Sequence, residues 1–287
     1  MSRIAYVNGR YLLHKRASVH IEDRGFQFAD AVYEVIAVRR GRLIDEGMHL
    51  GRLHRSLGEL RIAVPMSDAA MRAVMAEVVR RNRVLDGMLY LQVSRGSAPR
   101  DFAFPRHVKP SLVMTSRPAR GPAPRLIEEG VGVITIDDIR WARPDIKSVS
   151  LLPNALGKQR AKEAGAYEAW QVDAAGNVTE GTSSNAWIIT GAGEVVTRQA
   201  DRRILNGVTR LGLLGLLEGE GLRVVERPFS VAEAKAAREA FLTSTTNFVL
   251  PVVSIDGTPI GNGHPGSIVR KLRQVYDDYA AAQGEGP

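Results

Sequence analysis

Pro118-Ala-Arg-Gly-Pro-Ala-Pro124 is the stretch of sequence that determines how the chain divides. It contains three prolines and one glycine in seven residues. Proline fixes φ and lacks an N–H donor, so such a run interrupts helices and strands and is typical of a linker. We therefore expect an N-terminal small domain over residues 1–117, a linker over 118–124 and a C-terminal cofactor-binding domain over 125–287.

Helical and strand patterns occur on both sides of this linker. Before it, Val32–Val38 is rich in β-formers and predicts a strand, whereas the leucines of His49–Arg61 recur at helical spacing. After it, Val131–Ile136 predicts a strand and Leu151–Ala164 a helix. Mixed elements in both parts predict an α+β fold with two domains.

The composition excludes several classes of protein. The 287 residues include no cysteine, so disulfides, thiolate nucleophiles and cysteine metal sites are excluded. Residues Met1 to Arg24 contain no apolar run typical of a signal peptide. No later stretch approaches the roughly 18 apolar residues that a membrane span needs. We expect a cytoplasmic protein without membrane contact.

The net charge of +8 raises the alternative of a basic nucleic-acid-binding protein. Of the 39 basic residues, seven are lysines and 32 are arginines, and they are scattered along the chain. Because nucleic-acid sites concentrate their charge in patches, this distribution disfavours that alternative. We expect no nucleic-acid partner.

Familiar catalytic motifs are missing from the sequence. There is no GxxxxGK[ST] loop, no HExxH and no GxSxG. His49 and His54 lie five residues apart, which separates them around a helix, so they do not form a metal-binding pair. We expect no metal site.

Lys147 is the first candidate catalytic residue. It stands between apolar residues in Asp145-Ile-Lys147-Ser, just ahead of the predicted helix Leu151–Ala164. Partial burial would lower the pKa of its amine, which imine formation requires. From the residues alone, a surface lysine in a loop remains an alternative.

Two further segments could surround an anionic, aromatic ligand. Val178–Asn185 is rich in hydroxyls, and its Glu180 could keep a pyridine nitrogen protonated. Asn206-Gly-Val-Thr209 opens a predicted helix whose N-terminal N–H groups favour a phosphate, and Ser244-Thr-Thr246 closes a strand in a similar way. Taken singly, a polar turn and ordinary helix capping remain the alternatives.

Together these segments resemble the fold-type IV pyridoxal-phosphate enzymes, the family of D-amino acid and branched-chain aminotransferases. The sequence looks most similar to the D-amino acid aminotransferase (D-alanine transaminase) branch. The resemblance runs from Ile4 to about Val275 and implies a smaller N-terminal and a larger C-terminal domain with pyridoxal 5′-phosphate between them. The motifs that carry it are Ile21–Phe28, Val32–Val35, His49–Leu53, the Lys147 segment, Thr179–Asn185, Ile204–Arg210 and Thr243–Thr246.

The resemblance implies a role for each matching residue. Lys147 resembles the lysine that forms a Schiff base with the cofactor, and Glu180 the carboxylate that bonds the pyridine nitrogen. Arg52 matches the phosphate-binding arginine, and Leu205 the side chain that packs on the cofactor ring. The rest of the phosphate site would be Ser184, Val208, Thr209, Ser244 and Thr245.

Substrate recognition is implied by a loop and a strand tyrosine. Ser94–Phe102 resembles the loop that enters the neighbouring active site of a homodimer, where Arg100, aided by Tyr33, would bind the substrate carboxylate. Phe102 stands where the D-amino acid enzymes usually have histidine. This difference leaves the preferred amino donor and its enantiomer open.

The function implied is transfer of an amino group from a D-amino acid, such as D-alanine, to a 2-oxo acid, such as 2-oxoglutarate, through Lys147. Alternatives within the same fold are transaminases of branched-chain L-amino acids or (R)-amines, and aminodeoxychorismate lyase. All of them would use the same cofactor.

Overall fold

The computed structural model describes residues 3–285, which form two compact units. The first unit holds residues 3–120, 146–150 and 280–285, and the second holds 121–145 and 151–279. The main crossover falls between Arg120 and Gly121, but two later segments also belong to the first unit. The expected domains over 1–117 and 125–287 stay a prediction, because compactness does not show that either part folds alone.

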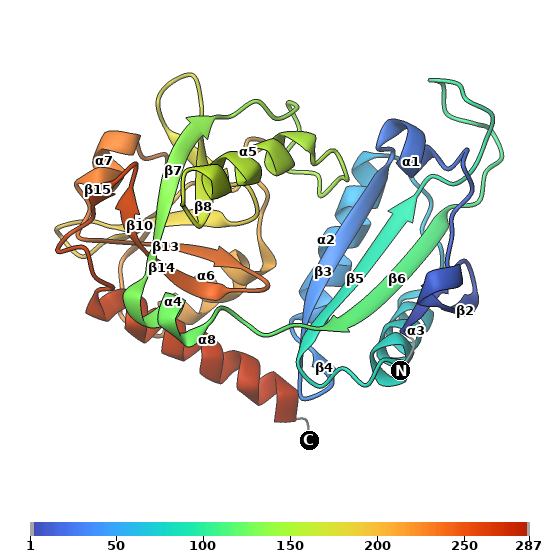
Figure 1. The fold of residues 1–287 in the computed structure, drawn as a ribbon, viewed down its shortest axis with the longest axis horizontal. Coiled ribbons are helices and arrows are strands. Elements are labelled where there is room, and N and C mark those ends of the chain that lie inside the picture. Colours follow the sequence, from blue (N-terminus) through green and yellow to red (C-terminus); the bar gives the residue numbers. More distant parts are fainter. Residues whose placement is uncertain (1–2, 286–287) are drawn as a thin grey trace. The chain divides into compact units, whose positions relative to one another are not determined.

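The first unit is built on a six-stranded antiparallel sheet with strand order β2-β1-β6-β5-β3-β4 (Figure 1). Its strands are β1 (Ile4–Val7), β2 (Arg10–Leu13), β3 (Ala31–Arg39), β4 (Arg42–Leu43), β5 (Gly87–Ser94) and β6 (Ser111–Pro118). Its helices are η1 (His14–Arg16), α1 (Arg24–Phe28), α2 (Glu46–Glu59) and α3 (Asp68–Arg81).

Helices α2 and α3 pack on one face of this sheet (Figure 1). Leu50, Leu53 and Leu57 recur along α2 and are buried against sheet residues such as Ile36. Side chains alternate along a strand, so Val32, Glu34 and Ile36 of β3 face the helices while Tyr33 faces the other side. The helix begins at Glu46, three residues before its predicted start.

The second unit contains a nine-stranded mixed sheet in which β7 pairs in parallel with β8 and β14 (Figure 1). Its strands are β7 (Val131–Asp137), β8 (Glu168–Val172), β9 (Val178–Gly181), β10 (Asn185–Ile189), β11 (Val195–Thr197), β12 (Val224–Glu226), β13 (Glu239–Ser244), β14 (Phe248–Ile255) and β15 (Thr258–Pro259). Its helices are α4 (Pro124–Glu129), α5 (Leu152–Glu163), α6 (Val208–Glu218), α7 (Val231–Lys235) and most of α8 (Ser267–Glu285).

Aromatic packing fixes the paired strands β10 and β13 at the centre of this sheet. The rings of Trp187 and Phe241 stack with centroids 5.2 Å apart, and both side chains are fully buried. Trp187 Nε1 donates to Thr243 Oγ1 at 2.9 Å, so the buried indole N–H is satisfied. These contacts hold β10 and β13 together next to Ser184 and Ser244, which lie at one end of the pair.

In the part of the chain that the structure describes, the helices are too short or too polar to pass through a bilayer.

Candidate active site

Lys147 lies in the first unit, on a segment that runs beside the start of β3. Tyr33 N donates to Lys147 O at 3.0 Å, and Lys147 N donates to Ser56 Oγ at 3.3 Å. Val149 N then donates to Ala31 O at 3.0 Å. The side chain is half-buried, with Nζ 4.4 Å from the centroid of the Tyr33 ring. Backbone bonds on both sides thus hold this lysine beside Tyr33.

Arg52 belongs to a buried cluster on the opposite face of β3. Its guanidinium donates to Glu34 along one edge, with Nε 2.8 Å from Oε1 and Nη2 2.6 Å from Oε2. His49, one helical turn earlier on α2, has Nδ1 2.7 Å from Glu34 Oε2. Glu34 is fully buried and His49 almost so. From the sequence, His49 was weighed and rejected as a metal ligand, and its bond to Glu34 was not predicted.

Charge and burial compete within this cluster. Burial raises the pKa of Glu34, but the charge and hydrogen bonds of Arg52, with the bond of His49, outweigh it and lower the pKa to about 2. Burial lowers the pKa of His49; the hydrogen bond and charge of Glu34 oppose this, but the charges of Arg52 and Lys147 add to the effect of burial, and the pKa stays below its usual value. At neutral pH His49 is therefore uncharged and donates its Nδ1–H to the Glu34 carboxylate.

This cluster predicts an acid-sensitive contribution to stability. The folded-state pKa of Glu34 lies below its usual 4.5, so its stabilisation is complete above pH 4.5 and is lost as the pH falls toward 2. In Glu34→Gln, the decrease in the free energy of unfolding from pH 7 to pH 3 should be smaller than in the wild type by about 2 kcal/mol. Urea denaturation at both pH values measures this difference.

Glu77 provides the matched control, because it also accepts from two arginines, Arg80 and Arg81, but on the surface of α3. Solvent screens exposed ion pairs, so Glu77→Gln should retain the acid dependence of the wild type. Equal acid dependence in Glu34→Gln and the wild type would contradict the prediction.

Glu180 lies in the second unit, on β9, with its carboxylate surrounded by donors. Oε1 accepts from Arg140 Nη1, and Oε2 accepts from Asn185 Nδ2 at 3.0 Å. Leu205 N lies 3.1 and 3.2 Å from the two oxygens. Burial raises the pKa of Glu180, and the guanidinium of Arg140 opposes that rise. The carboxylate is therefore held in one position and has a cationic partner.

Arg140 was not predicted from the sequence. Its Nε and Nη2 donate to the Asp138 carboxylate at 2.9 and 2.6 Å, and Thr179 Oγ1 donates to the same carboxylate at 2.8 Å. The guanidinium is therefore shared between Asp138 and Glu180. The one sequence signal was an aspartate and an arginine two residues apart, directly after β7.

Strand register brings the hydroxyl-rich segments of the second unit together. Asn185 of β10 is paired with Thr243 of β13, so Ser184 and Ser244 lie at the same end of this strand pair. Asn185 Nδ2 also donates to Leu205 O at 2.9 Å. These contacts join three segments that are far apart in the sequence.

The start of α6 lies against Asn185, at the same end of the β10–β13 pair. A side chain at Gly207 would lie 2.2 Å from Asn185 Oδ1, so only glycine allows this approach. Gly207 precedes the helix without any side-chain cap, which leaves the first helical N–H groups without that partner. Val208 and Thr209, the first two helical residues, are buried there. An anion is the complement of such a helix end.

The structure therefore groups the predicted residues into two sets. The first unit contains Tyr33, Arg52, Arg100 and Lys147. The second contains Glu180, Ser184, Leu205, Val208, Thr209, Ser244 and Thr245. Within residues 3–285, no group of three or more histidine, aspartate or glutamate side chains could hold a metal ion.

Arg100 contacts aromatic rings of α1 and of its own loop. Its guanidinium lies 4.8 Å from the centroid of the Phe28 ring and 5.7 Å from that of Phe102. The loop is held by buried Arg24, which donates to Asp101 O at 2.5 Å and to Asp30 Oδ2 at 2.8 Å. Phe102 itself is 79% exposed. The loop thus presents an arginine and an apolar ring at the surface of this chain.

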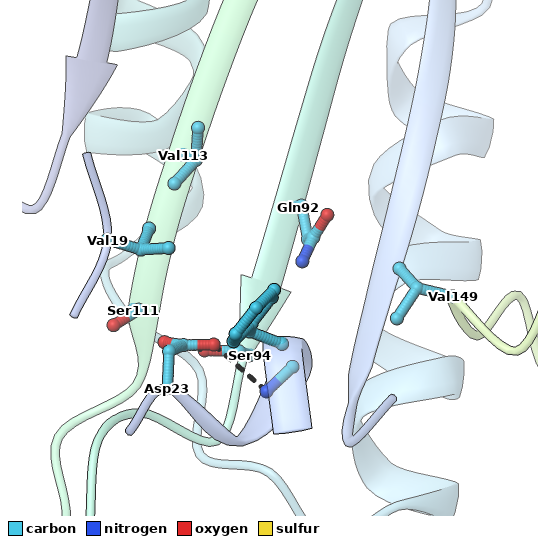
Figure 2. A pocket seen from close by; sticks show the side chains of 9 residues that line it. Val19, Asp23, Gln92, Ser94, Ser111, Val113 and Val149 are labelled. Atoms are coloured by element: carbon cyan, nitrogen blue, oxygen red, sulfur yellow. Dashed lines mark hydrogen bonds between the residues drawn. The ribbon is translucent and has the colours of Figure 1, made fainter. Parts of the chain in front are cut away.

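A pocket of about 340 Å³ lies in the first unit and was not predicted (Figure 2). Figure 2 shows Val19 and Val113 on one side, Val149 on the other and Gln92 between them. Gln92 is the cross-strand partner of Tyr33, so both side chains are on the same face of the sheet. The pocket therefore adjoins the face that carries Tyr33.

The polar end of this pocket is formed by a buried aspartate (Figure 2). The Asp23 carboxylate accepts from Gly25 N at 2.9 Å and from Ser94 Oγ at 2.7 Å. Both acceptor bonds fix the carboxylate beside apolar walls, an arrangement suited to a ligand or side chain with an apolar body and a polar tip.

Two D-alanine aminotransferases are similar to this chain over nearly its whole length. The D-alanine aminotransferase of Bacillus licheniformis is 42% identical over 271 residues, which cover 94% of this chain and 95% of that protein. The D-alanine aminotransferase of Staphylococcus haemolyticus is 36% identical over 275 residues, covering 96% of each.

Solved structures show the same fold at lower identity. The branched-chain amino acid aminotransferase of Escherichia coli superposes with a TM-score of 0.93 at 21% identity, covering 100% of this chain and 97% of that one. The T.th. branched-chain amino acid aminotransferase complexed with N-(5′-phosphopyridoxyl)-L-glutamate gives 0.90 at 23% identity, covering 99% and 95%. Residues 31–255 match the family model described as amino-transferase class IV. The chain belongs to the class IV aminotransferase family.

Proposed function

We propose that this chain is a pyridoxal-phosphate-dependent transaminase that moves the amino group of a D-amino acid, such as D-alanine, to a 2-oxo acid, such as 2-oxoglutarate. The observation that carries the proposal is Lys147, held by its backbone beside Tyr33. Its relatives named D-alanine aminotransferase are 36 to 42% identical over nearly the whole chain. That similarity supports D-amino acids over branched-chain substrates.

The residues fit pyridoxal phosphate in three respects. An amine stands beside an aromatic ring, a buried carboxylate with a cationic partner can bond a pyridine nitrogen, and an uncapped helix start can bind a phosphate. When bound, pyridoxal phosphate supplies an electron sink for negative charge at the substrate Cα. The residues that would hold its phosphate are Arg52, Ser184, Val208, Thr209, Ser244 and Thr245.

Each remaining residue would have a separate task. Lys147 would carry the cofactor on Nζ and, once displaced by the incoming amine, take the proton from the substrate Cα. Glu180 would keep the ring nitrogen protonated, and Arg140 would hold Glu180 in place for that bond. Leu205 would pack on the ring and exclude water from that side.

We further propose a homodimer in which the Arg100 loop of one chain completes the site of the other. Around this loop Ile21 and Phe26 are each 76% exposed, in addition to Phe102. Exposed apolar side chains gathered in this way favour burial against a partner. The pocket beside Val149 is a candidate to receive the partner's loop or the substrate side chain.

The Arg100→Ala variant tests this role. Loss of a charge-assisted pair with the substrate carboxylate should raise KM for D-alanine by roughly 10- to 100-fold. Amines without a carboxylate should be unaffected, because they never make this bond. Arg106→Ala, an exposed arginine after this loop and before β6, is the control and should leave KM unchanged. An unaltered KM for D-alanine in Arg100→Ala would count against the proposal.

The overall function is tested by the visible absorbance of the purified protein before and after D-alanine is added. A visible band that shifts to shorter wavelength, with pyruvate released only when a 2-oxo acid is consumed, supports the proposal. A band that responds to L-leucine or a chiral primary amine instead would transfer the assignment to those substrates. Pyruvate formed from aminodeoxychorismate without an acceptor would indicate the lyase.

A further inference from the structure

The bond between Glu34 and Arg52 does more than neutralise a buried charge. Glu34 accepts side-on from Nε and Nη2, so both carboxylate oxygens are used along one edge of the guanidinium. This two-point contact fixes the plane of the guanidinium as well as its position. A guanidinium is planar and carries five N–H donors. Because Glu34 holds one edge of this plane, the direction in which the other edge points is fixed as well.

Glu34 is itself held in place from two sides. It lies at a fully buried position within β3, between Tyr33 and Val35. His49 donates its Nδ1–H to the Oε2 atom that Arg52 also contacts. His49 and Arg52 are three residues apart on α2 and therefore share a face of the helix. The strand and the helix thus both determine where the carboxylate stands.

The same helix also positions the predicted cofactor lysine. Ser56, which accepts from Lys147 N, is four residues after Arg52 and lies next to it on the helix surface. Lys147 O accepts in turn from Tyr33 N, the neighbour of Glu34 on β3. The positions of Arg52 and Lys147 are therefore both determined by the same two elements, α2 and β3.

We propose that Glu34, supported by His49, is a positioning residue that orients Arg52 toward the phosphate of the cofactor and so fixes the spacing between phosphate and Lys147. The inference rests on the proposed function, in which Arg52 binds that phosphate. Glu34 itself does not touch the cofactor. Its effect should therefore depend on the presence of a phosphate in the ligand.

The test compares pyridoxal phosphate with pyridoxal, which lacks the phosphate. The full-length protein is titrated with each compound, and binding is followed by the absorbance of the lysine-bound form. Glu34→Gln should weaken pyridoxal phosphate by roughly 10- to 100-fold, the effect of a misdirected charge-assisted bond, and change pyridoxal by less than about twofold. Glu77→Gln, the surface carboxylate paired with two arginines, should change neither.

A double variant shows whether the effect passes through Arg52. In an Arg52→Met background, adding Glu34→Gln should weaken pyridoxal phosphate no further, because the orienting contact is already absent. This double variant also removes both buried charges and so avoids an unpaired one. His49→Gln keeps the Glu34 charge and should show a smaller loss, about three- to tenfold, again only for the phosphorylated compound.

The outcomes separate the inference from the function on which it rests. Equal weakening of both compounds by Glu34→Gln, or no weakening of either, overturns the positioning role. A further loss in the Arg52→Met background overturns it as well. Wild-type protein that binds neither compound at Lys147 overturns the proposed function instead, since no variant is involved in that result.

Discussion

Lys147→Ala is expected to abolish transamination, lowering kcat by at least roughly 10⁴-fold, and to remove the visible absorbance of the bound cofactor. The variant loses two functions at once, because the same amine would carry the cofactor and move the substrate proton. The fold should be unaffected, since the bonds that hold residue 147 come from its backbone N–H and carbonyl. Alanine retains both.

The measurement combines turnover of D-alanine with the absorbance spectrum and the melting temperature. Lys162→Ala, an exposed lysine of α5, is the control and should behave as the wild type in all three. A Lys147→Ala protein that keeps its melting temperature but loses both band and turnover supports the assignment. Retention of the band would mean that a different lysine carries the cofactor.

The second large effect is expected from Glu180→Gln, which should lower kcat by roughly 10²- to 10³-fold, as when one preorganised electrostatic partner is removed. With its carbonyl oxygen in the place of Oε2, glutamine can still accept from Asn185 and Leu205, whereas the negative charge and the bond from Arg140 are lost. The Arg140 guanidinium would then keep only Asp138 as counter-charge, and the loss of the negative charge at residue 180 would disfavour a proton on the ring nitrogen.

Kinetics with D-alanine deuterated at Cα separates this effect from weaker binding. Proton removal should become slower and more rate-limiting in Glu180→Gln, so the isotope effect on kcat should increase. Glu194→Gln, whose carboxylate pairs with Arg223 2.8 Å away, is the control in the same unit. A kcat within twofold of the wild type would remove Glu180 from the proposed chemistry.

The fold class could be predicted because local patterns determine it. Helical spacing of leucines and runs of β-formers gave two α+β parts, and the α+β, fold-type IV assignment is confirmed by the structural neighbours. The predicted boundaries of the elements were less accurate. Helix α2 begins at Glu46, after Asp45 in a left-handed conformation. The predicted start was too late, because an apolar pattern cannot mark a polar first turn. Helix α1 was missed because its five residues are too few for an apolar helical period to repeat.

Strand β9 shows why a strand with polar residues is not predicted from its hydrophobic pattern. The hydroxyl-rich segment Val178–Asn185 was interpreted as able to surround an anionic ligand, yet its first four residues, Val178–Gly181, are buried in a strand paired with β8. Thr179 and Glu180 are tolerated there because Asp138 and Arg140, about 40 residues earlier, satisfy them. Partners so distant in sequence leave no periodic signal.

The site residues could be predicted from sequence motifs, whereas the contacts that support them could not. Glu34 and Arg52 are 18 residues apart, and Lys147 and Ser56 are 91 apart. Spacing within one helix or strand is visible in a sequence, whereas pairing between a helix and a distant segment depends on the tertiary fold. The roles of these residues stay predictions until the variants are measured.

The composition of the first unit has a consequence for how the protein is made. Its sheet edge at β3 is completed by a segment around Lys147, and Gln283 exchanges two hydrogen bonds with Asp45, at 2.8 and 2.9 Å. A ribosome delivers the segment around Lys147 before most of the second unit, residues 151–279, and delivers Gln283 only after that unit. The start of β3 therefore keeps an unpaired edge until the chain has been synthesised past Lys147, whereas the bonds between Asp45 and Gln283 form only after the second unit has been synthesised.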